Sequence, residues 1–230
     1  MTTEPQPVSL TPIAPLHRPF KLRETVLGKL RTAIVTGELA EGALVSAPTL
    51  GHTLGVSATP VREAMMDLAR EGLVDTVKNK GFRVTAMSEK ELDDLAQIRL
   101  LLEPPAMHWI AGKIPADALR ELTELADTCT RAAENEDLEE YLRTDREFHA
   151  QLLSFAGNTQ LVDLATTLRM RTRMYGLRAL AGEGLLAATS REHHELLRLV
   201  AAGDAVSAER LLAQHIGHAR ELWATGTQTS

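Results

Sequence analysis

Four side chains in the second half of the chain have the chemistry of metal ligands. Asp145 and His149 stand four residues apart, which places a carboxylate and an imidazole on one face of a helix. The same face carries an apolar stripe made of Leu138, Leu142, Leu152 and Ala156. The stripe predicts a buried face, and a buried carboxylate is costly unless it is paired or bound to a metal.

Two further histidines fall into apolar stripes in the same way. His193 lies in the stripe of residues 185–202, and His215 lies in the stripe of residues 204–224. One aspartate and three histidines would then converge from three helices, a ligand set that suits Zn²⁺ and also Ni²⁺, Mn²⁺ or Co²⁺. The alternative is that each histidine is a hydrogen-bonded core residue and that no metal is involved.

Two other histidines adjoin these candidates. His194 points about 100° away from His193 around the helix. His218 follows His215 by three residues, on a neighbouring part of the face. We expect both to be exposed or to support the ligands from behind.

The residues around the candidate ligands do not complete a hydrolytic site. Metal-assisted hydrolysis needs an open metal position and a separate general base. Glu147 and Glu192 adjoin the ligands in sequence, but on a helix they point in other directions. The chain also has no glycine-rich phosphate loop and no Gly-x-Ser-x-Gly elbow. We therefore expect a protein that is not an enzyme.

Several arginines could bind a carboxylate beside such a metal. Arg99 stands just before the Pro104–Pro105 pair, which must kink or split its helix. A buried guanidinium can hold a carboxylate by paired hydrogen bonds, so Arg99 is a candidate for binding a carboxylate effector. The alternative is that Arg99 is a solvated or ion-paired arginine. Arg169, Arg171 and Arg173 alternate along another helix and cannot all face the same way.

The elements that must position these residues are helices. Ser88 is a candidate N-cap, and the apolar residues after it repeat at helical spacing without any strand pattern. We expect helices at 89–112 (kinked at the prolines), 116–135, 137–156, 159–181, 185–202 and 204–224. This order predicts an all-α helical bundle over 88–224, followed by a C-terminal tail at 225–230.

The first part of the chain follows another pattern. Residues 1–20 hold half of the ten prolines and few large apolar residues, which is typical of a flexible tail. A helical repeat then runs from Leu22 to Ile34, and Gly37 is placed to stop it. A short helix at 49–54 follows.

A third helix and a hairpin complete this part. Ser57 is a candidate N-cap for a helix that ends near Glu71. Two short strands at 74–77 and 82–85 flank a turn at 79–81. Helix, short helix, turn, helix and hairpin in this order predict a winged helix-turn-helix over 21–87, with its third helix in the DNA major groove.

Composition narrows the class of protein. The 230 residues carry a net charge of −6, yet residues 20–87 sum to +2 and residues 88–230 to −8. Such asymmetry indicates two modules with different partners, and the basic one remains compatible with DNA. A single cysteine, Cys129, excludes an internal disulfide. With no membrane-length apolar run and no signal peptide, we expect a soluble, cytoplasmic protein without a membrane partner.

Three runs in the first part resemble the DNA-binding domain of GntR-family transcription regulators. They are GVSATPVREA at 55–64, LAREGLV at 68–74 and KGFRV at 80–84. The second part resembles the all-helical FCD effector domain of the FadR-type subfamily. This second resemblance is carried by Arg99…Glu103, Asp145-x-x-Phe-His149, Gly157-Asn158, Glu192-His193 and Gly203-Asp204…His215.

The resemblance implies a homodimer that binds a short palindromic operator in double-stranded DNA. Ser57, Thr59 and Arg62 would contact the operator, and Lys80 and Gly81 would lie at the wing tip. Hydroxyls at a helix N-terminus suit phosphate, and an arginine one turn further can reach a guanine.

The sequence also departs from the family pattern. Ala58 stands where the family often has arginine, and Ser46–Thr49 replaces a usual Ser-Glu-Arg. Fewer basic contacts predict weaker or differently specific DNA binding and a shallower salt dependence. Pro104–Pro105 replaces helix-forming residues near Arg99, which alters the expected geometry there.

For the helical domain, the resemblance implies a divalent metal that helps bind a small organic or sugar acid. Its ligands would be Asp145, His149, His193 and His215. The function that follows is a DNA-binding regulator, a repressor that occludes a promoter, whose operator binding is modulated by the metal and the acid. A direct metal sensor and a metal-dependent hydrolase fused to a DNA-binding module are the alternatives.

Overall fold

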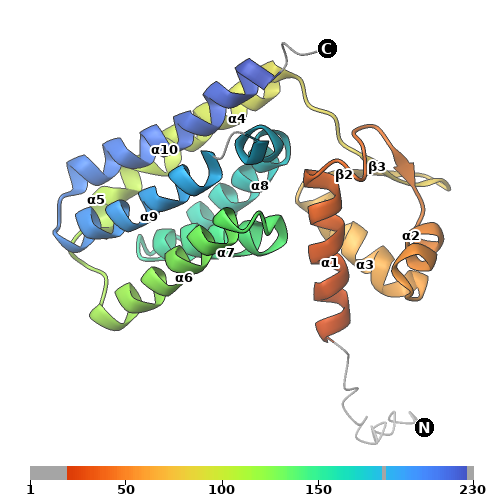
Figure 1. Cartoon of the computed structure of the whole chain (residues 1–230), viewed down its shortest axis with the longest axis horizontal. Coiled ribbons are helices and arrows are strands. Elements are labelled where there is room, and N and C mark those ends of the chain that lie inside the picture. The colour runs from red at the N-terminus through yellow and green to blue at the C-terminus, as the bar shows by residue number, and fades with distance from the viewer. Residues whose placement is uncertain (1–19, 183–184, 227–230) are drawn as a thin grey trace, which may run out of the picture.

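The two sequence patterns correspond to two bodies in space. The structure is a computed structural model that describes residues 20–182 and 185–226. Figure 1 shows a small N-terminal module beside a larger bundle of helices, joined by an extended segment after strand β3. Residues 1–19 of the expected N-terminal tail and residues 227–230 of the expected C-terminal tail lie outside the described residues.

The N-terminal module combines helices with a small antiparallel sheet. Its elements are α1 (Phe20–Val35), β1 (Leu44–Val45), α2 (Ala47–Leu54), α3 (Ala58–Arg70), β2 (Val74–Val77) and β3 (Gly81–Val84). The strands lie in the order β1-β3-β2, with Val74 opposite Val84 and Val77 opposite Gly81. This arrangement confirms the winged helix-turn-helix. The sequence does not predict β1, because two residues are too few to show an alternating pattern.

The turn between α2 and α3 is built from short polar residues. Ser46 caps α2, since its Oγ accepts a hydrogen bond from the Thr49 amide at 3.2 Å. Ser57 occupies the N-cap position of α3 in an extended conformation, but its side chain makes no capping hydrogen bond. The exposed Ser57 hydroxyl is therefore not committed to the helix that it precedes.

The bundle contains only helices among the described residues. They are α4 (Glu89–Leu102), the 3₁₀ turn η1 (Pro104–Ala106), α5 (Met107–Ile110), α6 (Ala116–Glu134), α7 (Leu138–Ser154), α8 (Thr159–Gly182), α9 (Leu185–Ala201) and α10 (Ala205–Gly226). Ser88 caps α4 through a capping box with Glu91, as the sequence predicts. The proline pair splits the first expected helix into three pieces. The last helix continues to residue 226, two residues into the expected tail.

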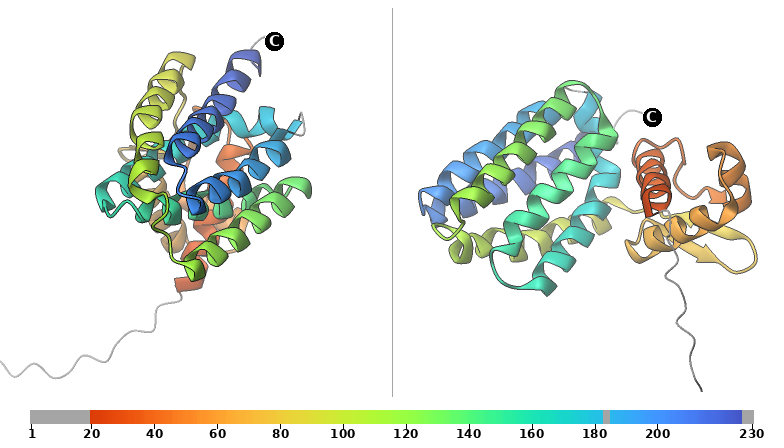
Figure 2. Two further views of the ribbon diagram at one scale, coloured as in Figure 1. Left: turned by 90° about the vertical axis from the view of Figure 1, so that its left-hand side faces the viewer. Right: turned by 90° about the horizontal axis from the view of Figure 1, so that it is seen from below.

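Two large apolar cores lie among the described residues, beside a small cluster formed by Leu92 and Ala96. One is confined to the bundle and includes Phe148, Leu152 and Ile216. The other joins the two bodies, because Val26 and Leu30 of α1 share it with Tyr141 of α7. Figure 2 shows the bundle helices side by side, with the N-terminal module at one end of them. The N-terminal module is thus packed directly on helices of the bundle.

None of the helices in the described part of the chain combines the length and apolarity that a membrane crossing requires.

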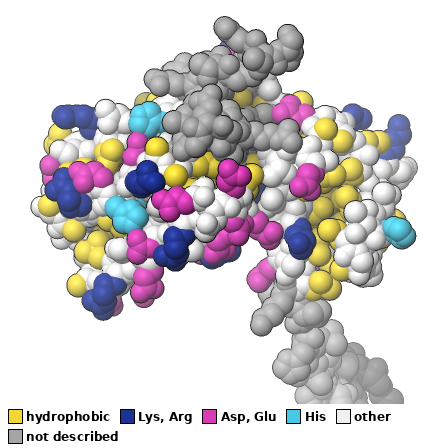
Figure 3. Space-filling view, viewed as in Figure 1, with side chains coloured by type: hydrophobic (Ala, Val, Ile, Leu, Met, Phe, Trp, Pro, Cys, Tyr) yellow, Lys and Arg dark blue, Asp and Glu magenta, His cyan; other side chains and the backbone are white. Residues whose placement is uncertain are grey.

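The surface of the bundle carries both positive and negative side chains. In the view of Figure 3, basic and acidic side chains are interspersed over it, and acidic ones gather near the border of the two bodies. The border has a hollow of about 550 Å³, whose lining includes Glu71, Glu139 and Glu147.

The wing depends on the absence of a side chain at Gly81. Its φ is +121°, and a Cβ there would lie 2.2 Å from the Val45 carbonyl oxygen in the neighbouring strand. We expect Gly81→Ala to lower the free energy of unfolding in urea by clearly more than Gly42→Ala. Gly42 also has a positive φ, +74°, but open space beside it, so its variant carries only the backbone strain of about 1–2 kcal/mol. Equal losses of unfolding free energy in the two variants would show that the close approach of β1 to β3 does not exclude a side chain at position 81.

Candidate functional site: a buried aspartate and three histidines

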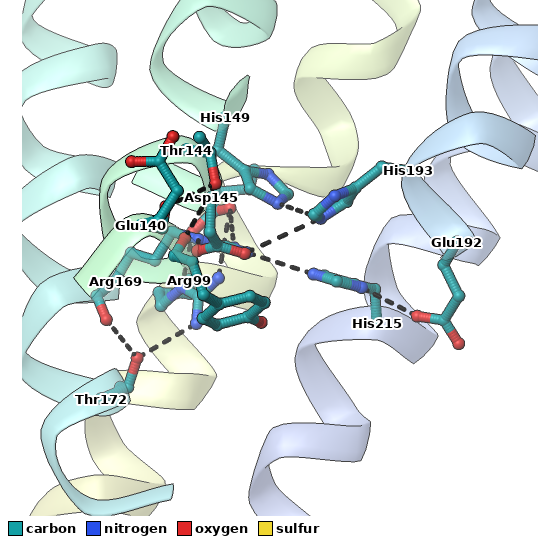
Figure 4. A network of polar contacts seen from close by, with 12 residues as sticks. Arg99, Glu140, Thr144, Asp145, His149, Arg169, Thr172, Glu192, His193 and His215 are labelled. Carbon is teal, nitrogen blue, oxygen red and sulfur yellow. Dashed lines mark hydrogen bonds and ion pairs between the residues drawn. The ribbon is translucent and has the colours of Figure 1, made fainter. Parts of the chain in front are cut away.

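The four predicted metal ligands lie together inside the bundle. Asp145 and His149 come from α7, His193 from α9 and His215 from α10 (Figure 4). Each offers one ligand atom, and these atoms all lie within 4.8 Å of one another. The four residues are between 1% and 5% exposed. Helical periodicity therefore identified the inward faces correctly on three separate helices.

Arg169 of α8 holds the carboxylate of this cluster. Its Nε donates to Asp145 Oδ2 at 2.8 Å, and its Nη2 donates to Asp145 Oδ1 at 2.9 Å. The same Nη2 contacts His215 Nε2 at 3.1 Å. Arg169 is 2% exposed, so this bidentate pair neutralises a carboxylate away from water.

Glu192 fixes the orientation of His215. The Glu192 carboxylate lies 2.8 Å from His215 Nδ1 and 3.0 Å from Nδ1 of the exposed His218. Because a carboxylate only accepts, Nδ1 of His215 carries the proton and Nε2 keeps a lone pair directed into the cluster. This is the tautomer that a metal requires. The expectation that Glu192 points away is therefore wrong, whereas His218 supports the cluster from behind, as predicted.

The other two histidines face each other. Their Nε2 atoms are 3.1 Å apart, so one ring donates a hydrogen bond to the other. Burial, followed by the positive charge of Arg169, lowers the pKa of His149 well below its usual range. The ring is therefore neutral at pH 7, the form in which imidazole binds a metal. Nδ1 of His149 is buried and has no hydrogen-bond partner among the described residues.

The donor set fits a divalent metal. Bonds of about 2.1 Å to a metal place neighbouring ligand atoms roughly 3 to 3.5 Å apart. The two Nε2 atoms of His149 and His193 already meet this separation, and Asp145 Oδ1 lies 3.8 Å from His193 Nε2. Shifts of about an ångström in the side chains would complete a four-ligand site.

Arg99 lies in the adjoining layer of this polar network. It donates to Glu103 at 2.6 Å and to Thr172 Oγ1 at 3.1 Å, and it is 2% exposed. Glu103 also faces Arg169, with 3.9 Å between Oε2 and Nη1. Arg99, the predicted carboxylate-binding arginine, is thus buried next to the cluster, but it is already paired with the carboxylate of Glu103, four residues later in the chain.

The sequence did not single out Arg169, Thr172 or Glu192 as parts of the site. Arg169 and Thr172 could have been found, since Leu161, Ala165 and Leu168 form a helical stripe with them. The contact of Glu192 with His215 joins α9 to α10, and no pattern within one helix predicts it. His194 is exposed beside Asp127, as expected.

The predicted DNA-contacting residues lie on one exposed edge of the N-terminal module. Ser57, Thr59 and Arg62 are exposed at the start of α3. A hollow of about 430 Å³ over this face is lined by Arg23, Thr59, Arg62, Glu63, Met66 and Arg70. Arg23 and Arg70 are both paired with Asp67. Arg62 forms no ion pair with any described residue, Glu63 included, so its guanidinium is available to a partner.

The two predicted wing residues differ in their surroundings. Lys80 is exposed in the turn between β2 and β3. Gly81 is the first residue of β3 and backs onto the Val45 carbonyl. Its glycine identity is therefore explained by the packing of the sheet, independently of any contact with DNA.

The buried pair of Arg99 and Glu103 provides a test of the network. In protein without added metal, we expect Glu103→Gln to lower the free energy of unfolding by about 3–5 kcal/mol, because a buried guanidinium loses its counter-charge. Glu195→Gln is the matched control, since Glu195 pairs with Arg198 at the surface, where such pairs contribute little. Urea unfolding monitored by circular dichroism measures both variants. Equal stabilities would contradict a buried charge network.

Comparison with known proteins agrees with this division. Residues 22–84 match the model described as "Bacterial regulatory proteins, gntR family", and residues 94–218 match the FCD domain. The chain is 29% identical over 189 residues to the transcriptional regulator McbR of Escherichia coli K12, covering 80% of this chain and 85% of that protein. It is also 29% identical over 203 residues to a probable D-xylose utilization operon transcriptional repressor of Paenarthrobacter nicotinovorans, with 84% and 87% covered.

Solved structures lead to the same family. The structure of Escherichia coli McbR/YncC superposes with a TM-score of 0.73 at 25% identity, covering 90% of this chain and 99% of that one. A putative GntR regulator from Rhodococcus sp. RHA1 shares the fold with a TM-score of 0.66 at 23% identity. These relatives are transcription regulators rather than enzymes, as the sequence predicts. The chain belongs to the GntR family of bacterial transcription regulators and carries an FCD domain.

Proposed function

We propose that this regulator is a homodimeric repressor that senses a small organic or sugar acid through a divalent metal. The module at 21–87 would bind a palindromic operator, and the module at 88–224 would bind the metal and the acid and pair the two chains. The observation that carries this proposal is the buried cluster of one carboxylate and three imidazoles. Such a donor set has few uses other than metal ligation.

The metal would be held by Asp145, His149, His193 and His215. Three nitrogen ligands and one oxygen ligand favour Zn²⁺, with Ni²⁺, Mn²⁺ or Co²⁺ as further candidates. When bound, the metal would supply a positive charge that attracts a carboxylate. Glu192 would keep Nε2 of His215 directed at it.

The charge balance of the site supports an acidic effector. The buried side chains that carry a formal charge are Arg99, Arg169, Glu103 and Asp145, and these charges cancel. A divalent metal would leave the site at +2, and Glu192 at its edge reduces that excess to +1. A buried excess charge is costly, so a carboxylate from outside would be stabilised there.

Arg99 would bind the acid directly in this proposal. Arg99 would turn part of its hydrogen bonding from Glu103 and Thr172 to the acid. The acid would then be held by an arginine on one side and by the metal on the other. Two-point attachment selects molecules with a carboxylate and a second oxygen donor at a fixed spacing.

The helices that carry the cluster also touch the DNA-binding module. Tyr141 lies one turn before Asp145 on α7 and belongs to the core shared with α1. Arg171 lies two residues after Arg169 on α8, and a Cβ at Gly72 would be 3.2 Å from its Cδ. A shift of either helix on acid binding would therefore reach α1 or the end of α3, which alters the spacing of two operator-reading helices in a dimer.

The repressor assignment is supported by a relative that is named as one. The Paenarthrobacter nicotinovorans relative is named as a probable transcriptional repressor of a D-xylose utilization operon. A module that covers a promoter can repress by steric occlusion alone, without any contact with the polymerase.

Metal analysis combined with thermal unfolding tests the sensor function. We expect about one zinc per chain in the unmodified protein and a rise in Tm with one class of carboxylic acid that a chelator abolishes, because a ligand of the native state stabilises it. His193→Ala and His215→Ala should lose the zinc. His194→Ala should retain it, since His194 is exposed and paired with Asp127. Unchanged zinc in the first two variants would contradict the site, and metal-dependent operator binding without any acid would favour a direct metal sensor.

Titration of an operator duplex tests the DNA-binding function. We expect two chains of 25.1 kDa per palindromic duplex. Arg62→Ala should cost about 1–3 kcal/mol of binding free energy and relax specificity at one base pair. Arg120→Ala, an exposed arginine of the bundle, removes the same charge and should leave the affinity unchanged. Fluorescence anisotropy on wild-type and base-substituted duplexes measures both effects, and equal losses for the two variants would contradict readout by Arg62.

A further inference from the structure

Arg169 stands where a cation in the Asp145 cluster would stand. Its Nη2 donates to Asp145 Oδ1 at 2.9 Å and lies 3.1 Å from His215 Nε2. Oδ1 is also the oxygen that lies 3.8 Å from His193 Nε2, so it faces the histidines. One guanidinium nitrogen thus engages two of the four atoms that the proposed metal would require.

We propose that Arg169 is a resident cation that holds the cluster together in the absence of metal and competes with the metal for Asp145 and His215. This inference rests on the proposed metal site. It adds Arg169 to that site and predicts the direction in which Arg169 changes the metal affinity. Arg169 would lower metal affinity, whereas an arginine that only orients the Asp145 carboxylate would raise it.

The hydrogen-bond geometry requires this competition. His215 carries its proton on Nδ1 and donates it in a hydrogen bond to the Glu192 carboxylate. The single lone pair on Nε2 can then accept a hydrogen bond from Arg169 or bind a metal, but not both. A guanidinium and a divalent metal in one buried site would also repel each other strongly. Metal binding must therefore move Nη2 away from His215.

The structure contains a second position for the displaced guanidinium. Nη1 of Arg169 is buried, has no hydrogen-bond partner among the described residues and lies 3.9 Å from Glu103 Oε2. A rotation that moves Nη2 off His215 can bring Nη1 within hydrogen-bond distance of Glu103. The Nε bond to Asp145 Oδ2, at 2.8 Å, can persist during that rotation. The guanidinium can thus leave the lone pairs of the cluster and still remain paired.

Zinc affinity in the full-length chain is the primary test. It is measured by competition with a chromophoric chelator for the wild type, Arg169→Gln and Arg143→Gln. Arg143 is the matched control, because it lies on α7, is about half exposed and pairs with Glu140 and Glu147 at the surface. We expect zinc to bind Arg169→Gln at least about tenfold more tightly than the wild type. Arg143→Gln should bind zinc like the wild type.

Thermal unfolding in chelator and in saturating zinc is the second test. Without metal, Arg169→Gln leaves Asp145 buried without a counter-charge, so its Tm should fall well below that of the wild type. Zinc should restore most of the loss, which makes the zinc-induced shift larger in the variant. Arg169→Met removes the remaining amide hydrogen bonds and should show the same pattern. A variant that stays unfolded in saturating zinc would overturn the proposal, since the metal is expected to replace the lost cation.

The outcomes separate this inference from the proposed function. If the wild type binds zinc and Arg169→Gln binds it equally or more weakly, the competition is refuted and the metal site stands. If only Arg169→Gln binds zinc, the competition is supported, and the unmodified protein is not a zinc-dependent sensor. If neither protein binds zinc, both proposals fail.

Discussion

The ion pair between Asp145 and Arg169 constrains the rest of the bundle. A carboxylate that is 2% exposed must be compensated, and the compensating guanidinium comes from another helix. Breaking such a pair costs about 3–5 kcal/mol, a large share of the stability of an ordinary domain. This ion pair therefore restricts how far α7 and α8 can slide past each other. His215 on α10 is drawn into the same arrangement through its contact with Arg169.

This constraint extends to the DNA-binding module because the same helices support both. The core around Tyr141 lies one turn from Asp145, and Arg171 packs on Gly72 two residues after Arg169. A helix tends to move as a rigid element, because hydrogen bonds join each turn of its backbone to the next. The polar cluster is thus connected to the N-terminal module through α7, α8 and the apolar core that α7 shares with α1. Tyr141 and α1 belong to the same core.

Most of the fold could be read from the sequence, because helical periodicity and N-caps act locally. The stripe through Asp145 and His149 predicted the inward face of α7, and Ser88 marked the start of α4. Residues whose role depends on another helix were harder to assign. Arg169 was ambiguous among alternating arginines, although its stripe with Leu161 and Ala165 pointed inward. Glu192 was assigned the wrong direction, because its partner His215 lies on α10, beyond the reach of any pattern within α9.

In the proposed sensor, charge balance would link the binding of the metal to the binding of the acid. Without metal the buried charges cancel, so a carboxylate entering the cluster would introduce an excess negative charge. With the metal bound the excess would be positive, and the same carboxylate would reduce it. Each ligand therefore creates the electrostatic condition that favours the other, and binding reciprocity makes the two enhancements equal. If Arg169 competes with the metal as proposed, its displacement toward Glu103 would determine how much positive charge the acid encounters and so would set the size of that coupling.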